Sequence, residues 1–250
     1  MQIAVAGDDI AGLTLALRLR IKGHAVVVHS HSARTSLDEQ FTVIAPMRDL
    51  FLKSGGALDD AIGLTAVNDA LEVQGLALPA SGAQTPAIRA VWGPEAARAW
   101  GLLLQQAAET WQAVRTDRYV PRGSLRRAAR RMLPDNRLQM LLMATTPDVE
   151  ALSDAAIVFP YLRQTFGCWR FDGGMSAFES VLRERCLKLG IEVAADPAPA
   201  NAMSLNQHFQ GMFSAPQRWF QRGSTVATAH LGLPFVGMAA EVIADRIGRA

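Results

Sequence analysis

The sequence predicts an α/β fold built around a parallel sheet, and two stretches of the chain support that prediction. Residues 2–30 show a short apolar strand, a glycine turn, a helix and a second strand, and residues 173–193 show a glycine turn, an amphipathic helix and a strand. Short apolar runs beside glycine are typical of buried parallel strands, and a helix between two of them forms a right-handed crossover. Half of the 250 residues are hydrophobic, which is enough for a large core.

The first elements follow from the spacing of apolar residues and glycines. Residues 2–7 are predicted to be a strand, and apolar residues then recur at helical spacing over 10–21, after which Gly23 ends the helix. Residues 24–30, rich in valine, predict the second strand. After a loop, a further helix is predicted around 47–56.

The rest of the chain is predicted to be mainly helical. Residues 71–79 alternate weakly between apolar and polar, which predicts one or two short strands. Helical patterns then cover 94–115, 124–131, 135–144 and 149–156. The remaining predictions are a linker rich in proline and alanine at Asp196–Ala202, a strand near 222–228 and a final helix over 237–250.

The turn at residues 7–12 has the outline of a dinucleotide-binding turn with one glycine replaced. In such turns the first glycine allows the tight turn, the second lets the backbone approach the pyrophosphate, and the third lets the helix pack closely on the strand. Gly7 and Gly12 stand at the first and third positions, and Asp9 stands at the second. Its bulk and negative charge oppose phosphate binding. Ser30 ends the second strand, where an acid would normally hold a ribose hydroxyl.

Two interpretations of this turn stay open on the sequence alone. In the first, the turn still holds a dinucleotide, and the cofactor-binding candidates are Gly7, Asp9, Ile10, Ala11, Gly12 and Ser30. In the second, Asp8 or Asp9 caps the free N–H groups of the helix, which then needs no phosphate. The fold is retained in both cases, and the cofactor is weakened or lost in the second.

Four stretches, in order, resemble the phytoene desaturase branch of the FAD-dependent amine-oxidase-like flavoproteins. The first is GDDIAGLTLALRLRIKGHAVVV, and the second is FTVIAPMRDLFLKSGGALDDAIGL at Phe41–Leu64. The third and fourth are FPYLRQTFGCWRFDGGMSAFESVL at Phe159–Leu182 and AHLGLPFVGMAAEVIADRI at Ala229–Ile247. Together they cover somewhat under half of the chain, and four matches in order are far more specific than one glycine motif.

The resemblance implies a two-part flavoprotein. A Rossmann-like FAD-binding domain would be built from both chain ends, 1–75 and 185–250, with an inserted and largely helical substrate domain over 76–184. Members of the family bind FAD without a covalent link and remove hydride equivalents from hydrophobic polyenes, often drawn from a membrane. By the resemblance, the further cofactor-binding candidates are Gly173, Gly174, Pro234, Gly237 and Met238.

The chain also departs from the family pattern, always in the direction of weaker FAD contacts. The arginine-containing GGR loop after the second strand is absent, and so is the D.G contact before Phe41. Asp172 stands where an arginine usually precedes the GGM segment, and the glycine run after His230 is shortened. Typical members are also considerably longer than this chain.

The sequence therefore favours an FAD-dependent oxidoreductase resembling phytoene desaturase, with a hydrophobic, polyene-like or isoprenoid-like substrate. The alternative is a non-catalytic binding or partner subunit, derived from a flavoprotein, that has lost FAD. NAD(P) in place of FAD is a weaker third hypothesis, because the ribose-binding acid is missing, although Arg34 is close to Ser30. No catalytic residue is predicted, since flavins carry the hydride chemistry themselves.

Other kinds of site are disfavoured by composition and spacing. The five histidines lack metal-ligand spacing, and Ser176 and Ser180 have no histidine partner, so neither a metal site nor nucleophilic catalysis is predicted. The net charge is +2, and nucleic acid is not a predicted partner. The basic run Arg126–Arg131 is most simply a solvated helix face, with an anionic-ligand or membrane-surface patch as the alternative.

The remaining expectations concern the core, the compartment and the partners. Trp92, Trp100 and Trp111 are predicted core side chains, and Cys168 is most simply a small buried hydrophobe. Two distant cysteines and no signal peptide favour the cytoplasm, with a peripheral membrane position as an alternative. No apolar run approaches the length of a spanning helix. The expected partner is a hydrophobic small molecule, and membrane-surface contact and a second subunit are further candidates.

Overall fold

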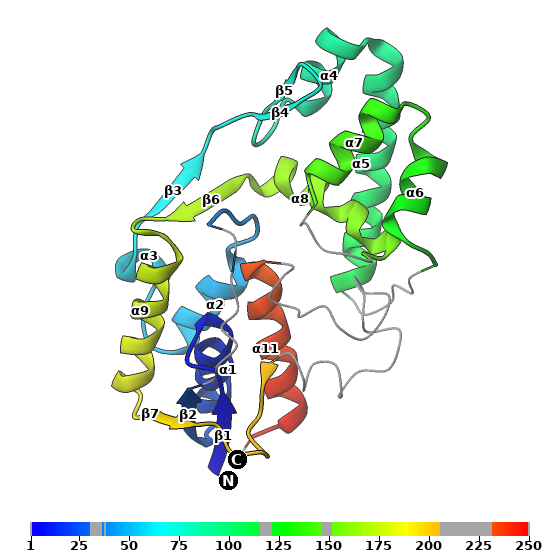
Figure 1. The fold of residues 1–250 in the computed structure, drawn as a ribbon. Helices are drawn as coiled ribbons and strands as arrows, with labels where there is room; N and C mark the ends of the chain where they lie inside the picture. Colours follow the sequence, from blue (N-terminus) through cyan, green and yellow to red (C-terminus); the bar gives the residue numbers. More distant parts are fainter. Residues whose placement is uncertain are drawn as a thin grey trace. The chain divides into compact units, whose positions relative to one another are not determined.

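The structure is a computed structural model, and it describes residues 2–30, 37, 39–115, 122–146, 152–205 and 232–249. These residues form two compact units (Figure 1). The first unit contains both ends of the described chain, up to Thr65 and from Trp169 onward, and the second runs from Ala66 to Cys168. The chain leaves the first unit after Thr65 and returns to it at Trp169, and both positions come earlier in the chain than the predicted boundaries at residues 75 and 184. The predicted strand near 222–228 lies outside the described residues.

The first unit is built on a parallel sheet of three strands in the order β1-β2-β7. The strands are β1 (Gln2–Ala6), β2 (Ala25–Ser30) and β7 (Glu192–Pro197). Val28 of β2 lies opposite Val5 on one side and Val193 on the other. Met203 forms a further parallel bridge to Val5, on the other edge of β1. The predicted α/β class with a parallel sheet is therefore confirmed.

The stretch predicted to be a linker belongs to this sheet instead. Its first two residues end β7, which is an edge strand of the described sheet and therefore tolerates a proline without a ladder N–H. The Ala198 N–H donates to the Ser30 carbonyl (3.2 Å), and the Ala202 N–H donates to the Pro199 carbonyl (2.8 Å). Since backbone hydrogen bonds fix residues 196–202, the linker prediction is wrong.

The helices described in the first unit include one that is buried on almost every side. They are α1 (Ile10–Ile21), α2 (Ala45–Lys53), α3 (Leu58–Ala61), α9 (Gly174–Lys188) and α11 (Leu233–Ile247). α1 contacts β1, β2, α2, α9 and α11, and its residues from Ile10 to Leu19 are all buried. A helix that is apolar all round is expected in such a position. α11 begins earlier than predicted, because Pro234 fits the first turn of a helix.

α1 and α11 lie side by side and run in the same direction (Figure 1). Arg18 pairs with Glu241, and Lys22, one turn later, pairs with Asp245, one turn later on α11. Residue numbers increase in the same direction along both helices at these contacts, so α1 and α11 are parallel and begin at the same end. α1 follows β1 directly, so this end is the edge of the sheet where β1 ends.

α9 is parallel to α1 as well. Arg183 of α9 bonds to Asp8, just before α1, and Arg20 near the end of α1 donates to the Leu189 carbonyl (2.9 Å), just after α9. Residue 183 is more than two turns into α9, so α9 begins beyond the start of α1. The N-termini of α1, α9 and α11, which are the positive ends of their dipoles, therefore lie at the edge of the sheet where the strands end.

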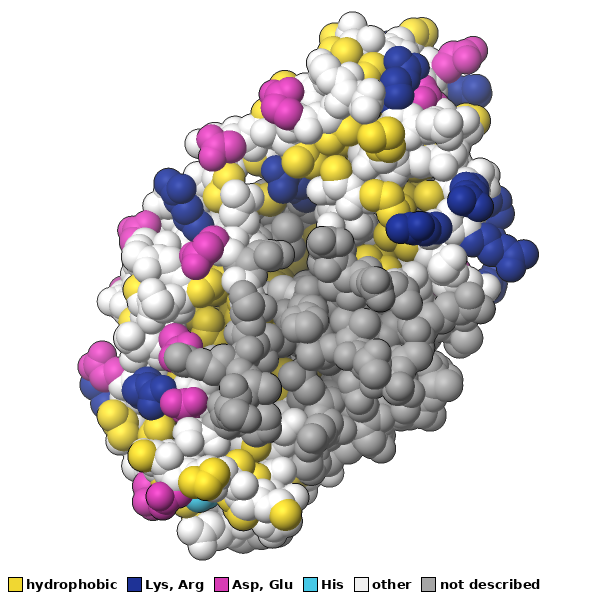
Figure 2. All heavy atoms as spheres, in the orientation of Figure 1, with side chains coloured by type: hydrophobic (Ala, Val, Ile, Leu, Met, Phe, Trp, Pro, Cys, Tyr) yellow, Lys and Arg dark blue, Asp and Glu magenta, His cyan; other side chains and the backbone are white. Residues whose placement is uncertain are grey.

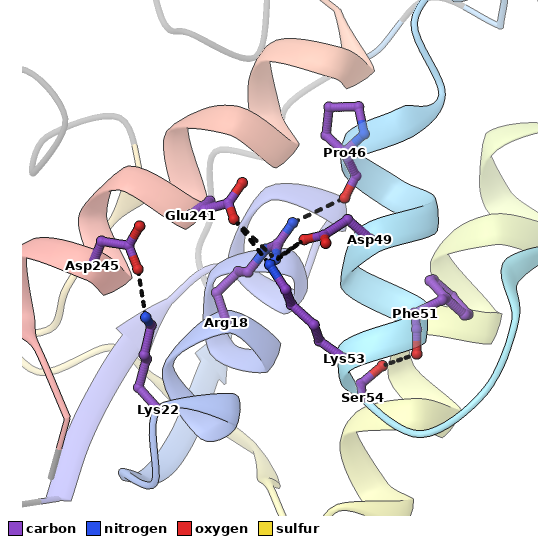
Figure 3. A network of polar contacts seen from close by, with 9 residues as sticks. All are labelled: Arg18, Lys22, Pro46, Asp49, Phe51, Lys53, Ser54, Glu241 and Asp245. Atoms are coloured by element: carbon purple, nitrogen blue, oxygen red, sulfur yellow. Dashed lines mark hydrogen bonds and ion pairs between the residues drawn. The ribbon is translucent and has the colours of Figure 1, made fainter. Parts of the chain in front are cut away.

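A buried arginine of α1 connects this helix to α2 and α11 (Figure 3). The side chain of Arg18 is only 4% exposed, and its guanidinium donates to the Asp49 carboxylate (2.6 Å) and the Pro46 carbonyl (2.9 Å). Glu241 of α11 lies 3.6 Å from the same guanidinium and 3.3 Å from Lys53. One arginine on α1 thus holds both α2 and α11.

The second unit is mainly helical, as predicted. Its elements are β4 (Leu71–Val73), β5 (Leu76–Leu78), α4 (Gln84–Trp92), α5 (Pro94–Arg115), α6 (Leu125–Met132), α7 (Asn136–Ala144), a 3₁₀ turn η1 (Asp154–Ile157) and α8 (Val158–Phe166). β4 and β5 form an antiparallel hairpin, and both turn residues, Gln74 and Gly75, have positive φ, as a tight two-residue hairpin requires. The chain passes between the units through β3 (Leu64–Val67) and β6 (Cys168–Phe171), which pair.

Two of the three tryptophans predicted to be in the core are there. Trp100 and Trp111 on α5 are 0% and 3% exposed. Trp92, at the end of α4, is half-buried, with the Arg137 guanidinium 5.3 Å from its ring centroid. A cation above an aromatic face is stabilising, so Trp92 has a specific partner although it is only half-buried.

Replacing Asp49 by asparagine tests the Arg18 cluster. The change leaves the buried Arg18 charge with Glu241 as its nearest anion, so we expect the free energy of unfolding to fall by about 1–2 kcal/mol, below the usual loss for a fully buried pair because Asp49 is partly exposed. Urea denaturation measures the loss. Asp59→Asn is the control, since the Arg48–Asp59 pair is more than half exposed and should contribute less than about 0.5 kcal/mol.

The same cluster predicts a pH dependence. Burial raises the pKa of Asp49, but hydrogen bonds from Lys53 and Arg18 outweigh it and hold the pKa below the ordinary 3.8. The carboxylate therefore stabilises the fold above pH 3.8, and this contribution is lost as the pH falls through the lowered pKa. Urea denaturation from pH 7 to pH 3 should show the gap between wild type and Asp49→Asn shrinking with acidification. A gap that widens would contradict the cluster.

Candidate functional site

The candidate site is the turn between β1 and α1, at the carboxyl edge of the sheet. Gly7 has φ +110°, and its N–H donates to the His29 carbonyl (2.9 Å), which joins the turn to β2. A Cβ atom at Gly12 would lie 1.7 Å from the Gly7 carbonyl oxygen. Only glycine fits at position 12, because the helix begins in direct contact with the backbone of the turn.

Asp9 occupies the start of α1 with its own carboxylate. It is the N-cap residue, with extended backbone, and its Oδ1 accepts a hydrogen bond from the Gly12 N–H (3.0 Å). The residue is only 6% exposed, and the neighbouring Ile10 and Ala11 are buried as well. A helix N-terminus attracts anions through its free N–H groups, and here a side-chain anion takes one of them.

The aspartate beside it is bound to α9. Arg183 Nη2 donates both to the Asp8 carbonyl (2.9 Å) and to the Asp8 carboxylate (3.0 Å). The two acids of the turn therefore have different tasks, since Asp8 fixes α9 to the turn and Asp9 caps α1. The capping interpretation of the sequence is borne out for Asp9.

Ser30 uses its hydroxyl within the sheet. Its Oγ donates to the Ala195 carbonyl of β7 (2.9 Å), at a shift in register between His29 and Ser30. The predicted place of Ser30, at the end of β2, is therefore correct, but the hydroxyl hydrogen that would have contacted a ribose is already bonded.

A second helix start is also capped by a carboxylate. Gly173 and Gly174 have φ +79° and +77°, and the Met175 N–H at the start of α9 donates to Glu39 Oε2 (3.0 Å). A Cβ atom at Gly174 would lie 2.8 Å from the same oxygen. Sequence reasoning missed Glu39, because nothing local relates residue 39 to residue 175. Asp172, just before these glycines, accepts a hydrogen bond from the Thr65 hydroxyl (2.7 Å).

The start of α11 has a different character. Gly232 is its N-cap residue, with φ +98°, so the cap position itself carries no side chain that could accept from the helix N–H groups. Pro234 is buried in the first turn, and Met238 is half-buried. A Cβ atom at Gly237 would lie 2.8 Å from the Pro46 side chain, so this glycine serves the contact with α2.

The pyrophosphate of a dinucleotide does not fit the start of α1 as it is built. A phosphate there would compete with the Asp9 carboxylate for the Gly12 N–H. Two unit charges about 4 Å apart repel by roughly 4 kcal/mol at the effective dielectric constant of about 20 typical near a protein surface. Glu39 places a second negative charge at the start of α9. The turn keeps the first and third glycines of a dinucleotide site, and the Asp9 carboxylate fills its anion position from within.

Redox-active thiols and metal sites find no support in the described residues. Cys168 and Cys186 are both free and buried, which confirms the interpretation of Cys168 as a small buried hydrophobe. Burial raises the pKa of both thiols, that of Cys186 to about 12. In the described ranges no three histidine, cysteine or acidic side chains are grouped so that they could hold a metal. The described helices also include none with the length and apolarity to cross a membrane.

Comparison with known proteins gives little more. No family model matches the chain, and no curated protein matches it. Among solved structures, an oxidoreductase from Methanosarcina mazei is similar, with a TM-score of 0.47 and 13% sequence identity over 78% of this chain. The match covers 51% of that protein, so the chain spans about half of its length. At this level the likeness carries no argument about activity.

Gly12→Ala tests the close contact in the turn. The added Cβ would overlap the Gly7 carbonyl, so we expect unfolding to become easier by about 3 kcal/mol or more, at the upper end of overpacking costs. The matched control is Gly101→Ala in α5, where a Cβ meets nothing within 4 Å and should be neutral or slightly stabilising. Equal stabilities of the two variants in urea denaturation would show that the contact is not tight.

The cysteines supply a second test. Because both thiols are buried and have raised pKa values, we expect neither to react with a thiol reagent at pH 8 while the protein is folded. Both should react in guanidinium chloride, which is the control. Rapid labelling of either thiol in the native protein would be inconsistent with the packing of β6 or α9.

Proposed function

We propose that this protein is a flavoprotein-derived α/β protein that works without FAD, as a binding or partner subunit. The observation that carries the proposal is the hydrogen bond from the Gly12 N–H to the Asp9 carboxylate, inside a turn that is otherwise shaped for a dinucleotide. Glu39 at α9 and Ser30 in the sheet support it, since each makes an internal hydrogen bond where the resemblance places a ligand contact.

The resemblance to the phytoene desaturase branch supports the proposed flavoprotein origin of the fold. Its first stretch corresponds to the turn after β1, α1 and most of β2, its second to α2 and α3, its third to α8, β6 and α9, and its fourth to α11. All of these except α8 and the first residue of β6 lie in the first unit, which contains both ends of the described chain. A Rossmann-like, oxidoreductase-type scaffold is therefore part of the proposal.

The second candidate is the FAD-dependent oxidoreductase itself, acting on a hydrophobic, polyene-like substrate. Two observations favour it: glycine is still required at position 12, and the N-cap residue of α11 is a glycine, which brings no carboxylate of its own to that helix start. FAD would supply the hydride chemistry when bound, and the chain would bind, orient and shield the substrate. The second unit, mainly helical, would be the substrate domain.

FAD binding decides between the two candidates. We expect the purified protein to show no flavin absorbance and its melting temperature to stay unchanged when FAD is added in excess. A specific ligand at one hundred times its Kd would add about 2.7 kcal/mol to the free energy of unfolding, which is easily detected. A yellow preparation, or a melting temperature that rises with FAD, would establish the second candidate instead.

Replacement of Asp9 tests whether its carboxylate is what opposes FAD binding. Asp9→Gly removes the carboxylate and restores the glycine of the family pattern, at a capping cost of a few tenths of a kcal/mol. We expect the affinity for FAD to rise about tenfold or more over wild type, which corresponds to removal of about 1.4 kcal/mol of repulsion. Asp8→Gly is the matched control, because Asp8 is engaged by Arg183 and not by the start of α1.

A further inference from the structure

α6 carries four arginines on its exposed surface. Leu125, Ala128 and Ala129 face the interior and are at most 3% exposed. Arg126, Arg127, Arg130 and Arg131 are all exposed. Figure 2 shows Lys and Arg side chains gathered at the right-hand edge, where Figure 1 places α6.

These arginines have no acidic partner in the part of the chain that the structure describes. The ion pairs found there join other residues, and the nearby Asp135 is bonded to Arg137. Arg126 and Arg130, like Arg127 and Arg131, are one turn apart, and like charges at that spacing destabilise a helix. Among the residues that the structure describes, no ion pair relieves this repulsion.

The helix dipole explains the placement of only two of these four arginines. Arg130 and Arg131 lie in the last turn of α6, where positive charge is favourable to the helix dipole. Arg126 and Arg127 lie in the first turn, where positive charge is unfavourable. Two arginines therefore oppose the helix that carries them, which points to an external anion as their counterpart.

We propose that this arginine face of α6 docks on an anionic phospholipid surface. Leu125, Ala128 and Ala129 of α6 are already buried in the second unit and Met132 is half-buried, so its outer face offers no apolar centre of the kind that a protein interface needs. A layer of phosphate head groups requires no such centre and no matching shape, and guanidinium groups bind phosphate in a fork. Nucleic acid fits less well, because this face offers four arginines, fewer than the roughly 6–10 phosphate contacts of a strongly salt-dependent duplex binder.

The docking surface is independent of the flavin question. It lies in the second unit, whereas the turn at Asp9 lies in the first, and no step of the argument uses FAD. The expected strength follows from charge alone. Each arginine near an anionic membrane contributes about 1 kcal/mol, or roughly fivefold in partition, so the loss of two should weaken binding about 25-fold.

Sedimentation with lipid vesicles at low salt tests the proposal on the full chain. The vesicles are phosphatidylcholine alone or phosphatidylcholine with about one third phosphatidylserine, chosen to give the negative surface potential of an anionic membrane. We expect binding only to the anionic vesicles, weakened by added salt and reduced about 25-fold by Arg126→Gln with Arg130→Gln. The control is Arg89→Gln with Arg98→Gln, which removes the same charge from exposed positions on α4 and α5. Circular dichroism and thermal unfolding check that all variants fold.

Three results would overturn the proposal. The first is equal binding to neutral and anionic vesicles, and the second is equal loss of binding in the α6 variant and the α4–α5 control. The third is no binding to anionic vesicles at low salt, whether or not the protein binds duplex DNA or an acidic polypeptide under the same conditions. Loss confined to the α6 variant, with the control unchanged, establishes the surface.

Discussion

The contact between Gly12 and the Gly7 carbonyl is the constraint on which the first unit depends. It allows α1 to begin directly against the end of β1, with no room for a side chain between them. α1 is then enclosed by the sheet, α2, α9 and α11, and nearly all of its residues are buried. Because α9 and α11 run parallel to α1, the same contact also fixes where three positive helix ends point. The anion chemistry of this edge follows from that arrangement.

The chain meets this concentration of helix dipoles with its own carboxylates. Asp9 comes from the turn itself, and Glu39 comes from a loop far away in sequence from the helix it caps. In a dinucleotide-binding protein of this design the ligand would supply the negative charge. Here the charge is part of the polypeptide and is present whether or not a ligand is. The fold thus has no need of a bound phosphate to satisfy these two N–H groups.

Much of the fold could be predicted from local patterns, and less of the site. The βαβ start, the capping role of an aspartate, the short strands within residues 71–79 and the buried tryptophans of α5 follow from spacing and residue type, which act over a few residues. The role of Glu39 depends on contact with Met175, and that of Gly237 on contact with Pro46, so neither is visible in a local pattern. The linker prediction failed because proline and alanine also suit an edge strand followed by a tight turn.

The N–H group of Gly12 reports on the central claim most directly. In protein labelled with ¹⁵N-glycine, its resonance can be followed while inorganic pyrophosphate or ADP is added. Since the Asp9 carboxylate already holds this N–H, we predict that the resonance stays in place up to millimolar ligand in wild type. A saturable shift of the Gly12 resonance in wild type would mean that a phosphate displaces the aspartate, and would contradict the account.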